Sequence, residues 1–208
     1  MNCALCPQKP KNRCNREGFD CTGGKLDPSD YGLAENRDLH NISDEIRACH
    51  GNTLTRLEEI IEFARRAGYT RLGLAFCIAL AREAELVATV LKNHFKVDSV
   101  CCKIAGLNKD EHAMPKIKPD QFEIACNPIG QARMLNRAKT DLNIMLGLCV
   151  GHDILFQKYC EAPVTVLAVK DRILAHNPLA VLHDSQRLRQ LGINNSFCQH
   201  NSTQGETT

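Results

Sequence analysis

Residues 71–103, RLGLAFCIALAREAELVATVLKNHFKVDSVCCK, decide the fold of this chain. The stretch opens with a short apolar run at residues 71–77, which is typical of a buried strand. Residues 78–94 then place apolar side chains at helical spacing, and a second short apolar run follows at residues 97–103. A strand, a helix and a strand in this order predict a β-α-β unit, in which the two strands lie parallel.

The same alternation continues on both sides of this unit. An amphipathic helix is expected at residues 53–68, and the polar, proline-containing residues 106–119 are expected to form a loop over the sheet edge. Asn127 and Pro128 are a typical start for a helix that runs to about Lys139. A strand or extended segment is expected at residues 122–130, further strands at residues 142–149 and 164–172, and a further helix at residues 152–160. The pattern predicts an α/β fold, a three-layer, Rossmann-like, mostly parallel sheet.

The first 32 residues differ from the rest. They are rich in Cys, Pro, Gly, Asn and Lys, and they contain few periodic apolar positions. Such a segment cannot bury a core of its own, so it needs a metal or a docking surface to hold it. The chain is therefore expected to consist of a Cys-rich metal-binding segment (residues 1–32), an α/β domain (residues 33–192) and a loose C-terminal tail (residues 193–208).

Composition excludes several classes of function. The net charge of +2 and the aromatic fraction of 5%, with no Trp, give no case for a nucleic-acid or anionic-membrane partner. No signal peptide and no run of about 18 apolar residues is present, which indicates a cytoplasmic protein. In a reducing compartment the twelve cysteines are expected to be ligands, reactive thiols or buried side chains rather than disulfides. The small-molecule or redox partner and the oligomeric state stay open.

Cysteines gather at the predicted strand ends. Cys77, Cys102 (next to Cys101), Cys126 and Cys149 each lie at or near the carboxyl end of an expected strand. Ligands of parallel sheets bind at this edge, and helix N-termini there favour the thiolate form of a cysteine. We expect these residues to line a cleft, where they either bind a second metal centre or other cofactor or supply a reactive thiol. The alternative is that small cysteines pack well at strand ends.

Other polar residues follow the same edge. His152, three residues after Cys149, is a candidate base for that thiol or a metal ligand. Lys170 and Asp171 follow the last strand and are candidates to orient a substrate, or they form a solvated turn. His176 is a candidate cofactor ligand or a capping residue. Cys149 is expected to be the most reactive thiol, since a helix terminus and a protonated His152 would both favour its thiolate.

The N-terminal cysteines have the spacing of metal ligands. Cys3, Cys6, Cys14 and Cys21 form the pattern C-x2-C-x7-C-x6-C. Four thiolates suit tetrahedral zinc or a [4Fe–4S] cluster, and Pro7 after the second cysteine is a feature of iron–sulfur segments. The alternative is an unstructured, reducible tail.

Several stretches together resemble a known family. These are CALCP, GLAFCIALAREAE, CNPIGQARMLN, GLCVGHDILFQKY and APVTVLAVKDRILAHNP, and the resemblance covers the chain from Cys3 to about Leu182. They resemble the uncharacterised proteins called domain of unknown function 1847, which occur mainly in anaerobic bacteria and archaea. The resemblance implies metal binding at the N-terminal cysteines and brings no established reaction.

The function is predicted in two ways. In the first interpretation the protein is a cytoplasmic metal-binding enzyme of redox or sulfur chemistry, with an iron–sulfur cluster or zinc and a Cys-lined cleft. In the second it is a non-enzymatic module that senses or carries a small ligand or metal and has a structural zinc knuckle. A third possibility, acyl transfer by Cys149 and His152, lacks an evident oxyanion motif. Metal and sulfide analysis with a visible spectrum separates the first two.

Overall fold

The structure is a computed structural model that describes residues 2–193. The chain forms two compact units, the first ending at Gly51 and the second beginning at Asn52. Residues 33–51, which the sequence placed with the sheet, therefore belong to the first unit. The predicted tail lies, apart from Ile193, outside the described residues.

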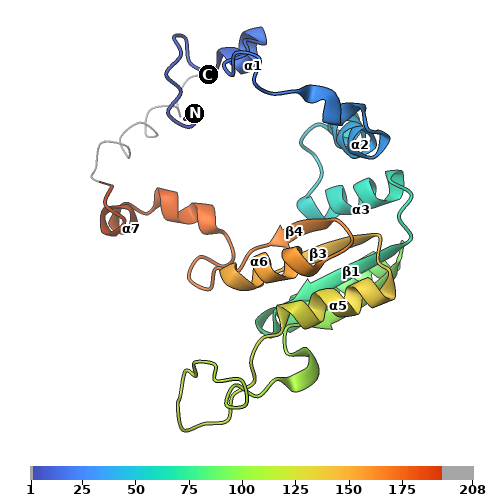
Figure 1. Cartoon of the computed structure of the whole chain (residues 1–208), viewed down its shortest axis with the longest axis vertical. Helices are drawn as coiled ribbons and strands as arrows, with labels where there is room; N and C mark the ends of the chain where they lie inside the picture. Colours follow the sequence, from blue (N-terminus) through green and yellow to red (C-terminus); the bar gives the residue numbers. More distant parts are fainter. Residues whose placement is uncertain (1, 194–208) are drawn as a thin grey trace, which may run out of the picture. The chain divides into compact units, whose positions relative to one another are not determined.

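The second unit contains one parallel sheet (Figure 1). All four strands run in the same direction, and their order is β2-β1-β3-β4. The strands are β1 (Arg71–Phe76), β2 (Lys96–Cys101), β3 (Leu142–Leu146) and β4 (Val164–Ala168). The predicted parallel α/β fold is confirmed.

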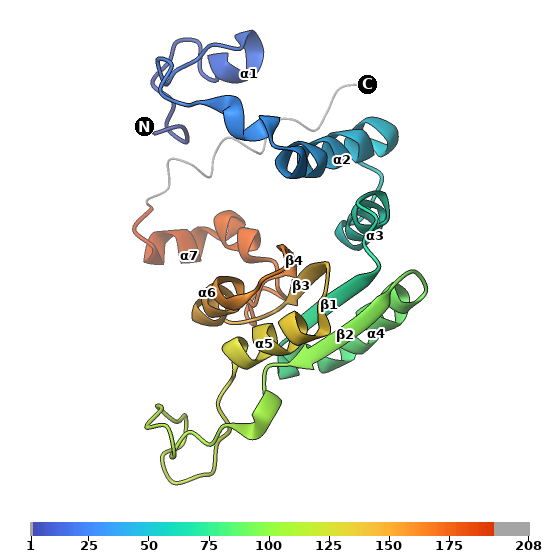
Figure 2. The ribbon, with the colours of Figure 1, turned by 45° about the vertical axis from the view of Figure 1, so that its right-hand side comes forward.

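One expected strand does not form. In residues 122–130 the only ladder contact among the described residues is a single antiparallel bridge between Asn108 and Ile124. The bridge closes the long loop between β2 and α5, which leaves the carboxyl end of β2 (Figure 2). The end of the segment is instead used to start α5, because Asn127 is the N-cap of that helix and Pro128 is its first residue.

Helices connect the strands and begin at the capping signals that the sequence contains. Thr55 and Glu58 form a reciprocal capping box at the start of one helix, and the Asn127 side chain accepts a hydrogen bond from Gly130 N–H at another. The second unit contains α3 (Arg56–Arg66), η2 (Ile78–Leu80), α4 (Ala81–Lys92), η3 (Ile104–Gly106), α5 (Pro128–Ala138), α6 (Val150–Tyr159), η4 (Pro178–His183) and α7 (Ser185–Gln190). No helix of the described residues has the length and apolar character needed to cross a bilayer.

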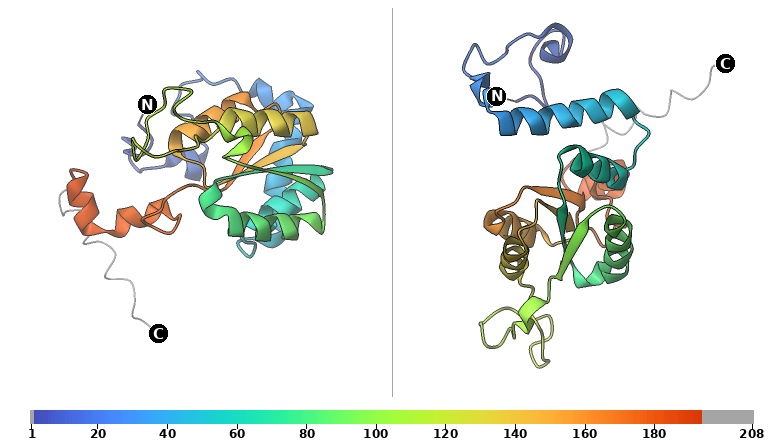
Figure 3. Two further views of the ribbon diagram at one scale, coloured as in Figure 1. Left: turned by 90° about the horizontal axis from the view of Figure 1, so that it is seen from below. Right: turned by 90° about the vertical axis from the view of Figure 1, so that its right-hand side faces the viewer.

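The sheet is covered on both faces. Leu72, Leu74 and Ile144 point to one face and pack against α3 and α4. Ala75 and Met145 point to the other face and pack against α5 and α6. Figure 3 shows the strands between these two groups of helices. Side chains of a strand alternate between its two faces, so strands buried on both faces read as continuous apolar runs in the sequence.

The first unit has almost no core. It contains α1 (Arg13–Glu17), η1 (Pro28–Gly32) and α2 (Ala34–His50). No side chain in residues 2–33 is buried, and Ile46 is the only buried residue among those described in this unit. The Cys-rich segment thus has the low apolar burial that its composition predicts.

Candidate functional site

The strand order places a topological switch point between β1 and β3. From β1 the chain proceeds outward to β2, and it then returns to the other side of β1 to build β3 and β4. Two neighbouring strands whose connections leave in opposite directions create a crevice outside their carboxyl ends. Cys77 directly follows β1 and Cys149 follows β3 by three residues, so both lie at this point.

Lys170 lies between these two cysteines. It follows the end of β4 by two residues, and its side chain crosses the end of β3 to reach β1. Lys170 Nζ is 2.5 Å from Cys77 Sγ and 3.6 Å from Cys149 Sγ. Because Cys77 is only 4% exposed, this lysine–sulfur contact is shielded from bulk water.

The surroundings of Cys77 favour its thiolate. Burial by itself would raise the pKa of the Cys77 thiol, but the hydrogen bond from Lys170, the N–H of Ala79 and the charge of Lys170 outweigh it, and the pKa is lowered. Burial would likewise lower the pKa of Lys170, yet the hydrogen bond to Cys77 and the charges of Cys77 and Cys149 raise it. Both shifts favour the thiolate form of Cys77 and the ammonium form of Lys170 in this contact.

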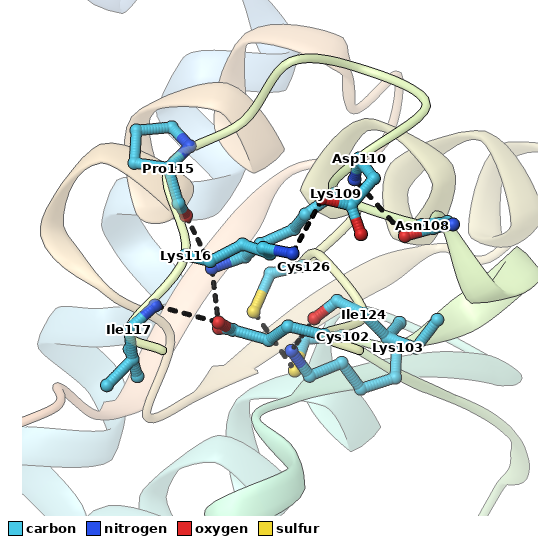
Figure 4. Close-up of polar contacts among 11 residues, drawn as sticks. Cys102, Lys103, Asn108, Lys109, Asp110, Pro115, Lys116, Ile117, Ile124 and Cys126 are labelled. Atoms are coloured by element: carbon cyan, nitrogen blue, oxygen red, sulfur yellow. Dashed lines mark hydrogen bonds and ion pairs between the residues drawn. The ribbon is translucent and has the colours of Figure 1, made fainter. Parts of the chain in front are cut away.

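Cys102 and Cys126 form a second sulfur pair beside the first. Their Sγ atoms are 3.7 Å apart (Figure 4), and the N–H of Ile78 points at Cys102 Sγ from 3.4 Å. Burial raises the pKa of Cys102 to about 12, and negative charge on Cys126 and Cys77 adds to the effect. Cys102 is therefore a protonated thiol. The structure brings the four predicted strand-end cysteines together at one edge of the sheet, whereas their roles there stay predictions.

His152 lies in this region without pairing with Cys149. In the described part of the chain no hydrogen bond joins the His152 ring to Cys149 Sγ; their contact is a backbone one, from His152 N–H to Cys149 O at 2.8 Å. Burial lowers the pKa of His152, and the nearby charges of Lys170 and Lys103 lower it further. A neutral imidazole is thus favoured, and the cation beside Cys149 is Lys170 rather than a protonated His152.

Asp171 and His176 hold the turn that carries Lys170. Asp171 Oδ1 accepts hydrogen bonds from the N–H groups of Ile173 and Leu174, at 3.1 and 2.9 Å. His176 Nδ1 lies 3.1 Å from both the Asp171 N and the Val169 O, on either side of Lys170. Their predicted roles in orienting a substrate and binding a cofactor stay predictions. What the structure adds is that both side chains shape the lysine turn.

Sequence reasoning missed Gln131. This side chain of α5 is fully buried, and its Nε2 donates to the carbonyl oxygens of Phe76 at 3.1 Å and Val100 at 2.7 Å. These carbonyls immediately precede Cys77 and Cys101, so Gln131 joins the ends of β1 and β2. Its Oε1 is the one buried side-chain oxygen or nitrogen without a partner among the described residues. The sequence did contain a signal for it, because Gln131 is the one polar residue on the buried face of α5, beside Pro128, Ala132 and Leu135.

The N-terminal cysteines are partly gathered. Cys3, Cys6 and Cys21 line one open pocket of about 530 Å³, while Cys14 is exposed outside its lining. Hydrogen bonds from backbone N–H groups, first that of Asn12, lower the pKa of Cys6 and favour its thiolate, which is the form that binds metals.

The donor chemistry of this segment fits a thiophilic metal, but the described geometry does not close a site. In residues 2–193 no three Cys, His, Asp or Glu side chains lie close enough to hold one metal ion. This holds for the N-terminal segment and for the sheet edge alike. The predicted zinc or iron–sulfur site is therefore not shown.

Comparison with known proteins identifies the family. The sequence profile described as "Protein of unknown function (DUF1847)" matches residues 26–167. The chain belongs to the DUF1847 family. The uncharacterized protein MJ0455 of Methanocaldococcus jannaschii is 45% identical over 186 residues, which are 86% of this chain and 96% of the relative. The predicted resemblance is confirmed, and the four N-terminal cysteines lie before the part of this DUF1847 protein that the profile matches.

A solved structure shows a distant likeness. The crystal structure of Dph2 from Pyrococcus horikoshii aligns with a TM-score of 0.34 and 18% sequence identity, over 66% of this chain. The aligned part is 33% of that protein, so the DUF1847 chain spans about a third of its length. A likeness of this size carries no information on ligands or activity.

Proposed function

We propose that this DUF1847 protein is a metal-binding enzyme of redox or sulfur chemistry, whose reactive group is the thiolate of Cys77. One observation carries the proposal: Lys170 Nζ is 2.5 Å from Cys77 Sγ and also within 3.6 Å of Cys149 Sγ, at the switch point of a parallel sheet. An ammonium held against a shielded sulfur keeps it anionic, and the thiolate is the nucleophilic form of cysteine.

The lysine favours a reactive thiol over a second metal centre at this edge. Its ammonium occupies one side of the Cys77 sulfur and repels a cation that would bind there. The same charge stabilises an anionic leaving group. Because Cys77 and Cys102 are almost fully buried, the electrophile has to be small.

A sulfur electrophile suits this arrangement. The Cys77 thiolate attacks one sulfur of a small disulfide R–S–S–R; a Cys77–S–S–R bond forms, the S–S bond of the substrate breaks, and R–S⁻ leaves with the electron pair. Lys170 lies where its charge stabilises that thiolate, and Cys149 lines the approach, since it is more exposed than Cys77.

The metal belongs to the N-terminal segment in this proposal. Cys3, Cys6, Cys14 and Cys21 would hold an iron–sulfur cluster or zinc, which would supply electron transfer or the folding free energy of residues 2–33. The absence of buried side chains in these residues and the thiolate-favouring contacts of Cys6 support it.

The thiolate is tested by titration, because the ultraviolet absorbance of a thiolate requires no reagent to reach a buried sulfur. The difference between wild type and Cys77→Ser gives the ionisation of Cys77. We expect its midpoint to lie below that of an ordinary cysteine and to rise in Lys170→Met, because the hydrogen bond and the charge that oppose the effect of burial are then lost. Lys158→Met, on the exposed face of α6, is the matched control and should leave the midpoint unchanged. A midpoint that Lys170→Met leaves in place refutes the proposed pair.

The metal is tested by analysis of iron, zinc and sulfide after anaerobic purification, with a visible spectrum. Iron, sulfide and colour that disappear in Cys3→Ser and Cys6→Ser but persist in Cys77→Ser support the proposal. Stoichiometric zinc without colour favours the second interpretation, a non-enzymatic module with a zinc knuckle.

A further inference from the structure

Cys102 and Cys126 are placed to form a bond with each other. Their Sγ atoms are 3.7 Å apart, and the N–H of Asn127 donates to the carbonyl oxygen of Cys102 at 2.8 Å. The two backbone segments are therefore already adjacent. A disulfide requires an Sγ–Sγ distance of about 2.05 Å, which side-chain rotation can supply when the backbones lie this close.

The loop that carries Cys126 is fixed rather than free. Lys103 Nζ donates to the Ile124 carbonyl at 2.6 Å, and Ala125 N–H donates to the Leu107 carbonyl at 2.7 Å. Figure 4 shows Lys103 and Ile124 joined beside the two sulfurs. These two bonds engage the peptide group between Ile124 and Ala125, and the bond from Asn127 N–H to the Cys102 carbonyl lies on the other side of Cys126, so Cys126 is held beside Cys102.

Cys102 lies between Cys126 and Cys77. Phe76 and Cys101 are the last paired residues of β1 and β2. One further hydrogen bond follows them, from Cys102 N–H to the Phe76 carbonyl oxygen at 2.9 Å. Cys77 and Cys102 are thus neighbours at the ends of adjacent parallel strands. The N–H of Ile78 pointing at Cys102 Sγ from 3.4 Å places that sulfur next to the residue after Cys77.

We propose that Cys102 and Cys126 are a redox-active dithiol that resolves a mixed disulfide formed on Cys77 by a small disulfide substrate. The proposal rests on the reactive Cys77 thiolate proposed above. It turns the sheet edge into a two-electron exchange site in which three sulfurs act in sequence.

The exchange balances without another reactant. After Cys77–S–S–R has formed, the Cys102 thiol loses its proton and attacks Cys77 Sγ, and the second R–S⁻ leaves. Cys126 then loses its proton and attacks Cys102 Sγ, which releases the Cys77 thiolate and leaves a Cys102–Cys126 disulfide. The two protons pass to the two R–S⁻ groups. One small disulfide is reduced to two thiols while one protein dithiol is oxidised.

The electrostatics favour this order of events. Burial is the main cause that keeps Cys102 protonated in the resting state, and negative charge on Cys126 and Cys77 contributes. Once Cys77 has become a neutral mixed disulfide, the charge on Cys77 is gone, so Cys102 ionises more readily.

The experiment adds bis(2-hydroxyethyl) disulfide to the reduced, anaerobically purified full-length protein, followed by acid quenching, intact mass and non-reducing peptide mapping. We expect a Cys102–Cys126 disulfide in the wild type and two thiols released for each disulfide formed. Cys126→Ser should stop at a Cys77–Cys102 disulfide. In Cys77→Ser the Cys102–Cys126 bond should form about tenfold more slowly, since no activated thiolate starts the exchange. Cys160→Ser, which removes another partly buried thiol of this unit, should behave as wild type.

The double variant Cys102→Ser, Cys126→Ser separates the two proposals, and it should accumulate the mixed disulfide on Cys77. If the adduct accumulates there but wild type also retains it and forms no Cys102–Cys126 bond, the dithiol is refuted while the reactive thiolate stands. If the double variant, folded by circular dichroism, forms no adduct on Cys77, the proposed function fails. A wild-type map that joins Cys77 to Cys149 instead likewise overturns the dithiol.

Discussion

The two glycines of the stretch GLCVGHD are expected to respond to alanine in opposite ways. Gly147 directly follows β3, has a φ of +66°, and donates its N–H to the Ala168 carbonyl at 2.7 Å. A Cβ at this position would lie 2.2 Å from Leu80 Cδ1, inside the core. Gly151 lies in α6 with an ordinary helical backbone, and a Cβ there meets no atom within 4 Å.

The magnitudes follow from these contacts. A left-handed alanine costs about 1–2 kcal/mol, and overpacking against buried Leu80 costs about 1–3 kcal/mol. Alanine also reduces the conformational freedom of the unfolded chain, which by itself raises the free energy of unfolding by about 0.5–1 kcal/mol. Gly147→Ala should therefore lower the free energy of unfolding by about 1–4.5 kcal/mol. Gly151→Ala should raise it by about 0.5–1 kcal/mol, because alanine is the better helix former.

Urea denaturation followed by circular dichroism measures both variants under identical conditions. A difference of less than about 1 kcal/mol between them, or Gly151→Ala as the less stable variant, would refute the reasoning from backbone angle and packing. Gly147 also starts the turn that leads from β3 to Cys149. We therefore expect Gly147→Ala to disturb the lysine–cysteine contacts, while Gly151→Ala leaves them intact.

Three further predictions concern the thiols and the metal. Burial raises the pKa of Cys160 to about 11, so this thiol stabilises the fold fully below its unfolded pKa of about 8.5 and loses that contribution as pH rises toward 11. Between these values the unfolding free energy of the wild type should fall faster than that of Cys160→Ala, by up to about 1.4 kcal/mol per pH unit. A strong chelator should make residues 2–33 sensitive to proteases and leave the sheet unit resistant; equal resistance with and without chelator contradicts metal-dependent folding. Cys77→Ser should remove more thiolate absorbance at neutral pH than Cys149→Ser, and the reverse result would return the leading role to Cys149.

The local elements could be predicted because their signals are local. Apolar periodicity and the Asn127–Pro128 start are properties of neighbouring residues, and they gave the strands, the helices and the parallel architecture. Errors arose where a boundary depends on other parts of the chain. The third strand ends at Leu146 because Gly147 turns into a left-handed conformation, so Cys149 begins a helix instead of ending the strand. Residues 122–130 are apolar enough for a strand, but their last residues, from Asn127 on, form the start of α5 instead.

The sequence by itself determined that Cys77 and Cys102 would follow the ends of strands and that residues 1–32 would lack a core. Strand order and partners were decided only by the tertiary structure. Placing β3 beside β1 and β4 beside β3 brings Lys170 to Cys77, 93 positions apart in the chain, and makes Cys77 rather than Cys149 the sulfur with the closest cation. The reason is physical: periodicity reports which face of an element is buried, whereas the neighbour it meets is set by packing among distant segments, which leaves no local trace.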